Sequence, residues 1–117
     1  MKSEIKRLLL AAKNSIVGWR YLITTEPNIR YLLLLLLLTL ALGLSRVISL
    51  IQLAILVTAL ALVVGLEIAN TIIETLLDSQ TTRYSPAVRK IKDMGSAAVF
   101  FGLTIYGLIL LVMLVFG

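Results

Sequence analysis

The sequence contains no cysteine and no histidine. Without cysteine, disulfides, thiolate chemistry and cysteine-ligated metals are excluded. Without histidine, the chain also lacks the commonest general base and the commonest ligand of transition metals. Any acid–base chemistry must therefore come from Glu, Asp, Lys or Tyr. Any bound metal should be a hard ion held by oxygen atoms, with Mg²⁺ as the natural candidate.

Apolar residues dominate what is present. Hydrophobic residues make up 60% of the 117 residues, and the mean hydropathy is +1.04. Soluble domains are usually about half apolar, and here the excess is concentrated in long continuous runs. We therefore expect an integral membrane protein, and the length allows one domain only.

The basic residues are unevenly distributed around the apolar runs. Before the first run stand Lys2, Lys6, Arg7, Lys13, Arg20 and Arg30, and between the last two stand Arg83, Arg89, Lys90 and Lys92. Arg46 alone lies between the first and second runs. By the positive-inside rule, the N-terminus and the last loop face the cytoplasm, while the C-terminus lies outside. This arrangement requires three spans.

We expect an all-α membrane fold in which an amphipathic helix precedes the three spans. The first segment repeats apolar residues at helical spacing and carries Trp19 and Tyr21, which suit the depth of lipid headgroups. A secretory signal is disfavoured, because some 30 mixed residues precede the first apolar run. The expected segments are a surface helix at 2–25, spans at 29–44 and 47–78 with the second extending into the cytoplasm, a cytoplasmic loop at 79–88, and a third span at 89–116 with a cytoplasmic start.

Four polar residues near the end of the second span share one helical face. Glu67, Asn70, Glu74 and Asp78 follow one another at spacings of three, four and four. A bilayer core of about 30 Å takes roughly 20 residues, so counting from Ile48 puts Glu67 at its inner edge. Polar groups at this depth are costly and usually functional.

Other polar residues should reach the same level. Glu26 stands just before the first span, and Lys92, Asp93 and Ser96 stand just before the third. The carboxylates could hold Mg²⁺, Lys92 could bind a phosphate, and Glu67 could act as a general base. In the alternative interpretation, Glu67 and Asn70 join helices by hydrogen bonding. The remaining charges, Glu74, Lys92 and Asp93, are then ordinary solvated residues at helix ends.

Two further alternatives belong to other functional classes. Glu67 could be the proton or cation site of a small oligomeric transporter, which predicts a position near the middle of the membrane. Gly95, Ala98 and Gly102 form a strip of small residues that lets membrane helices approach closely. That strip would also suit an assembly subunit without catalytic activity.

Two stretches resemble the prokaryotic membrane diacylglycerol kinase family, which also includes undecaprenol kinases. They are Glu67-Ile-Ala-Asn-Thr-Ile-Ile-Glu-Thr-Leu-Leu-Asp78 and Lys92-Asp-Met-Gly-Ser-Ala-Ala-Val99. The two patterns at this spacing, before a last apolar span, are highly specific together. Glu26 with Asn28 and Arg30 resembles the family pattern before the first span.

The resemblance implies a homotrimer whose active sites are shared between neighbours. The implied reaction transfers the γ-phosphoryl group of ATP to the hydroxyl of diacylglycerol, or alternatively of undecaprenol. It further implies the bacterial inner membrane as the location. Glu67 matches the general base, and Glu26 and Glu74 match the ligands of the Mg²⁺ that accompanies ATP.

The resemblance also implies substrate contacts, position by position. The implied ATP contacts are Asn14, Glu26, Glu74, Arg83, Tyr84, Ser85, Lys92 and Asp93. The implied contacts with the lipid substrate are Arg7, Ala11, Ala12, Ser15, Arg30, Glu67, Asn70 and Ser96. Leu32 departs from the family, because relatives often carry Glu or His there, and Arg83-Tyr84-Ser85 replaces a stretch that usually contains His.

Overall fold

The computed structural model describes residues 1–80 and 85–117, and its described elements are four α-helices. They are α1 (Lys2–Thr25), α2 (Pro27–Leu44), α3 (Leu50–Gln80) and α4 (Pro86–Phe116). The last three are each long and apolar enough to cross a membrane. The chain is thus an all-helical, multi-pass membrane protein, as the sequence predicted.

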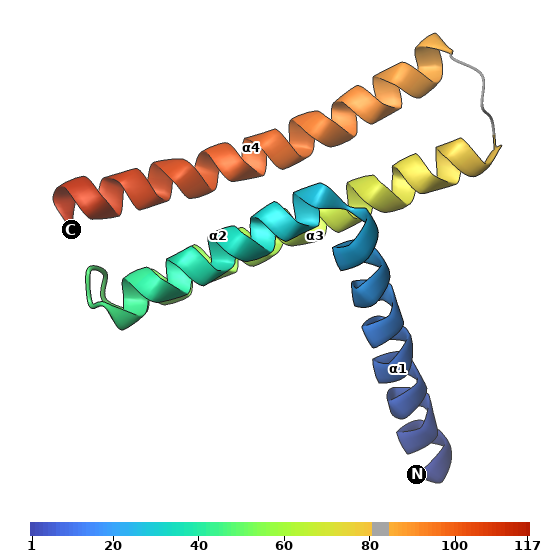
Figure 1. Cartoon of the computed structure of the whole chain (residues 1–117), viewed down its shortest axis with the longest axis horizontal. Coiled ribbons are helices and arrows are strands. Elements are labelled where there is room, and N and C mark those ends of the chain that lie inside the picture. The colour runs from blue at the N-terminus through green and yellow to red at the C-terminus, as the bar shows by residue number, and fades with distance from the viewer. Residues whose placement is uncertain (81–84) are drawn as a thin grey trace.

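The break between α1 and α2 follows from Glu26 and Pro27. Proline suits the first turn of a helix, where its missing N–H costs nothing. Glu26 is extended, with φ −112° and ψ 103°, and its N–H caps α1 by donating to the carbonyl oxygen of Leu22. The chain therefore changes direction here, and the axis of α1 lies at a steep angle to the axes of the other three helices (Figure 1).

A reciprocal pair of hydrogen bonds begins α3. The N–H of Ser49 donates to Oε1 of Gln52 at 2.9 Å, and the N–H of Gln52 donates to Oγ of Ser49 at 3.1 Å. This capping box satisfies two backbone donors that the first turn leaves unpaired. Arg46, in the turn before it, has a positive φ of 62°. The helix therefore begins at Leu50, three residues after the expected start of the second span.

The core is built around α3, which packs against both α2 and α4. Leu56, Leu60 and Val63 of α3 are at most 1% exposed, and Val99 of α4 packs in the same cluster. Most other large apolar side chains point outward, which suits helices surrounded by hydrocarbon. No residue of α1, all of which is described, is buried.

Candidate active site

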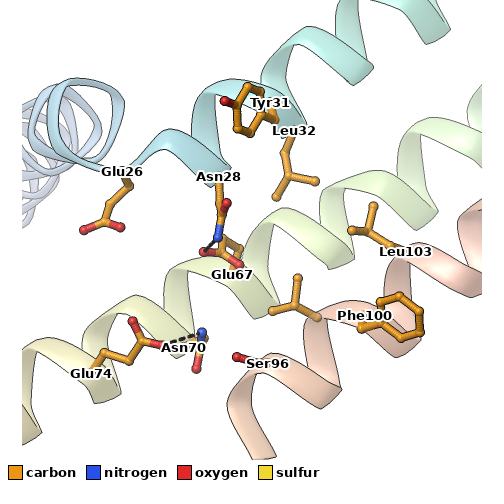
Figure 2. A pocket seen from close by; sticks show the side chains of 11 residues that line it. Glu26, Asn28, Tyr31, Leu32, Glu67, Asn70, Glu74, Ser96, Phe100 and Leu103 are labelled. Atoms are coloured by element: carbon orange, nitrogen blue, oxygen red, sulfur yellow. Dashed lines mark hydrogen bonds between the residues drawn. The ribbon is translucent and has the colours of Figure 1, made fainter. Parts of the chain in front are cut away.

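A cavity of about 360 Å³ lies between α2, α3 and α4 (Figure 2). Its lining divides into polar and apolar residues. The polar residues are Glu26, Asn28, Glu67, Asn70, Glu74 and Ser96, and the others are Tyr31, Leu32, Val99, Phe100 and Leu103. An amphipathic cavity of this kind suits a ligand with one polar end and one hydrocarbon end.

Glu67 is the most buried carboxylate of the cavity, with 4% of its surface exposed. Nδ2 of Asn28, from the first turn of α2, donates a hydrogen bond of 3.3 Å to Oε1 of Glu67 (Figure 2). Burying a carboxylate is costly unless hydrogen bonds compensate for the lost water. Asn28 provides such a bond and fixes one oxygen, while the side chain still lines the cavity.

Asn70, one helical turn further along α3, is 7% exposed. Its Nδ2 donates to Oε1 of Glu74 at 3.2 Å. Its Oδ1 is buried and finds no hydrogen-bond partner among the described residues. This oxygen faces Gly95 of α4, where a Cβ atom would overlap it. Buried polar atoms are nearly always paired. Because Oδ1 is covered by Gly95, the amide would have to move before this oxygen could accept a hydrogen bond from a ligand.

Glu26 and Glu74 bring two further carboxylates to the cavity. Glu26 occupies the N-cap position of α2, yet within the described residues its side chain makes no capping hydrogen bond. Figure 2 shows both carboxylates on the same side of Glu67. No group of three or more acidic side chains in the described ranges could hold a metal ion. Two carboxylates are nevertheless enough for Mg²⁺, which usually keeps several waters and takes phosphate oxygens as its other ligands.

The comparisons with known proteins decide the family. The model of the prokaryotic diacylglycerol kinase family matches residues 13–114, which include every residue that lines the cavity. The chain belongs to the prokaryotic diacylglycerol kinase family. Membership implies diacylglycerol kinase activity, the ATP-dependent phosphorylation of a lipid. The search of individual curated proteins found no match.

The family match confirms the resemblance drawn from the two sequence patterns. It favours the kinase over both the transporter and the assembly subunit that the residues alone left open. The matched range begins at Lys13, so Arg7, Ala11 and Ala12 lie outside it. Their proposed contacts with the lipid therefore depend on the sequence resemblance alone.

Lys92 and Asp93 of this kinase do not line the cavity. Nζ of Lys92 lies 2.8 Å from Oδ1 of Asp78, at the end of α3. Oδ1 of Asp93 lies 3.3 Å from Nε of Arg89. Both ion pairs are substantially exposed, so a charged ligand could compete for either residue. The contacts of Lys92 and Asp93 with ATP remain predictions.

Two of the expected substrate contacts have structural partners of their own. Nη1 of Arg30 donates to the carbonyl oxygens of Ile23, at 2.8 Å, and Thr24, at 3.3 Å, and so ties α2 to the end of α1. Oγ of Ser85 caps α4 by accepting the N–H of Val88 at 3.1 Å. The remaining two loop contacts, Arg83 and Tyr84, lie outside the described residues.

The expected contacts on α1 lie away from the cavity in this single chain (Figure 1). Arg7 and Ala11 line a separate hollow near the N-terminus, together with Glu4 and Leu8. The other three, Ala12, Asn14 and Ser15, are exposed. Their roles stay predictions.

The sequence reasoning missed Asn28 as a site residue. Asn28, Leu32 and Thr39 recur at helical spacing on α2, and the last two are buried. That stripe marks the side of α2 that faces α3. Asn28 is the polar residue at the inner end of this stripe, two positions after Glu26. That position was the signal that could have identified it. The aromatic and aliphatic residues of the lining carry no comparable signal, because apolar residues fill the whole span.

Proposed function

We propose that this cavity is the active site for lipid phosphorylation and that Glu67 is its general base. The buried carboxylate of Glu67, in a cavity with both polar and apolar walls, carries the proposal. Phosphoryl transfer needs positioned substrates, neutralisation of charge and a group that accepts the proton of the attacking hydroxyl. With one oxygen bonded to Asn28, the carboxylate has a second oxygen for that proton.

The acceptor would place its hydroxyl beside Glu67 and its hydrocarbon along Leu32, Phe100 and Leu103. Asn70 and Ser96 would contact its polar end, and their place in the cavity lining supports this role. Diacylglycerol is the acceptor that the family implies. Undecaprenol is the second candidate, because it also joins a single hydroxyl to a long hydrocarbon.

Glu26 and Glu74 would hold Mg²⁺, and both residues line the cavity. When bound, Mg²⁺ would neutralise charge on the phosphates of ATP. Lys92 would add a positive charge for the nucleotide. The other proposed ATP contacts are Asn14, Arg83, Tyr84, Ser85 and Asp93.

The proposed topology puts the N-terminus in the cytoplasm and the C-terminus outside. With 31 residues, α3 is longer than the roughly 20 residues that a bilayer core requires. Its last turns, which carry Glu74 and Asp78, would then extend into the cytoplasm, where ATP is available. We also propose a homotrimer, in which α1 of one subunit could contribute to the cavity of its neighbour.

The test is transfer of labelled phosphate from ATP in detergent–lipid micelles, with and without Mg²⁺. Diacylglycerol and undecaprenol are offered separately, and Glu67→Gln is compared with Glu4→Gln, an exposed glutamate of α1. We expect Mg²⁺-dependent transfer that Glu67→Gln abolishes and Glu4→Gln preserves. Transfer that survives in folded Glu67→Gln would contradict the assignment of the general base.

A further inference from the structure

Beyond the apolar end of the cavity, a hydrogen bond joins α2 to α4. The hydroxyl groups of Thr39 and Tyr106 are its two partners, and they lie 67 positions apart in the sequence. Both residues are buried, Thr39 at 1% and Tyr106 at 4% exposed. The bond thus bridges the same two helices that form opposite walls of the cavity.

The direction of this bond follows from the other partner of Thr39. Oγ1 of Thr39 donates to the carbonyl oxygen of Leu35 at 2.8 Å. A hydroxyl group has one proton, so Thr39 must accept from Tyr106. Each hydroxyl is therefore satisfied, which matters in the membrane interior because no bulk water can replace a missing partner. The Thr39–Tyr106 hydrogen bond, called the bridge below, therefore joins α2 to α4 at one fixed level.

The bridge lies close to the cavity along α4. Tyr106 follows Leu103, which lines the cavity, by three residues, or about 4.5 Å along the helix. On α3, Leu56 and Leu60 are 0% exposed and belong to the same core cluster as Tyr106. The interior is thus filled at the level of the bridge and hollow next to Leu103.

We propose that Tyr106 is a specificity-determining residue that, with Thr39, closes the outer end of the acceptor cavity. The bridge limits how far the hydrocarbon of the lipid can follow the groove between α2 and α4. Acceptors whose chains end before the bridge fit fully, and longer chains must leave the groove sideways. This inference rests on the proposed function, because it requires the acceptor to occupy this cavity.

The test compares kcat/KM for diacylglycerols that carry short and long acyl chains, at a fixed mole fraction in one detergent. Tyr106→Ala removes the ring and opens the groove, while Tyr106→Phe keeps the ring and removes only the bond to Thr39. Phe101→Ala is the matched control, because Phe101 lies on the same helix, is 67% exposed and does not line the cavity.

We expect Tyr106→Ala to raise the ratio of long-chain to short-chain kcat/KM by about 10-fold, a typical effect of reshaping an apolar pocket. Tyr106→Phe should shift the ratio in the same direction by less, and Phe101→Ala should leave it unchanged. An unchanged ratio in an active Tyr106→Ala enzyme would overturn the inference. If Tyr106→Ala is inactive with every acceptor, an unchanged ratio in Tyr106→Phe overturns it instead.

The same assay separates this inference from the proposed function. If Glu67→Gln keeps full activity, the proposed site itself is wrong. If Glu67→Gln is inactive and the chain-length ratio does not respond to Tyr106, the site stands and only the role of Tyr106 fails.

Discussion

Oδ1 of Asn70 occupies the space that a Cβ atom on Gly95 would need. The contact joins the proposed site on α3 to α4, and any larger residue at position 95 would force the side chain of Asn70 to move. The small-residue strip at Gly95, Ala98 and Gly102 was expected to serve packing. At Gly95, the close approach also positions a residue that lines the cavity.

Gly95→Ala should displace Asn70 and so disturb its bond to Glu74. Adding a methyl group to a packed interface typically costs about 1–3 kcal/mol. We expect lower thermal stability in detergent together with lower kcat/KM for the lipid. Ala98→Gly, in the same strip but outside the cavity lining, is the control and should leave kcat/KM unchanged. Full activity in Gly95→Ala would show that the position of Asn70 is unimportant.

Asn28→Ala should reduce kcat more than it changes the KM for ATP. It removes the hydrogen bond that holds Oε1 of Glu67, and a bond to a charged group contributes about 1.5–3 kcal/mol. The expected loss in kcat is about 10-fold or more. Asn28→Gln, which keeps an amide donor on a longer side chain, should recover part of it. Equal losses in both variants would indicate a packing role instead.

Glu74→Gln and Glu26→Gln should each weaken the dependence on Mg²⁺. Replacing a carboxylate oxygen by an amide removes a charged ligand, and even outer partners of metal ligands are worth about 10–100-fold in affinity. We expect the Mg²⁺ concentration at half-maximal activity to rise by about 10-fold or more, with activity partly recovered at high Mg²⁺. An unchanged Mg²⁺ titration would remove that residue from the proposed metal site.

Lys92→Ala should raise the KM for ATP with little effect on stability. Its ion pair with Asp78 is partly exposed, and such pairs typically contribute about 0–1 kcal/mol. Asp78→Asn breaks the same ion pair but leaves the lysine free, so it should not raise the KM for ATP. If both variants raise it equally, the ion pair itself is what the site requires.

Local sequence patterns predicted the part of the cavity lining that lies on one helix. Glu67, Asn70 and Glu74 share a face because of helical periodicity, and all three line the cavity. Contacts between helices were not predictable in the same way. The bonds from Asn28 to Glu67 and from Tyr106 to Thr39 depend on how neighbouring helices are aligned lengthwise. The sequence of a uniformly apolar span contains little information about that lengthwise alignment, because one apolar residue can pack in place of another.

The position of α1 shows a second limit of the sequence. Its amphipathic pattern predicted a surface helix, and no residue of this fully described helix is buried. The substrate contacts expected on it come only from the family resemblance. They do not line the cavity of this single chain, and nothing in the periodicity of α1 relates them to Glu67.

The most direct test of the central claim measures kcat and ATP binding together in Glu67→Gln. If Glu67 is the general base, kcat should fall by about 10²–10⁴-fold. The affinity for Mg²⁺-ATP and the thermal stability should stay close to those of the unmodified protein. A kcat close to the original value would contradict the role of Glu67 as general base, as would a loss of kcat fully explained by unfolding or by lost ATP binding.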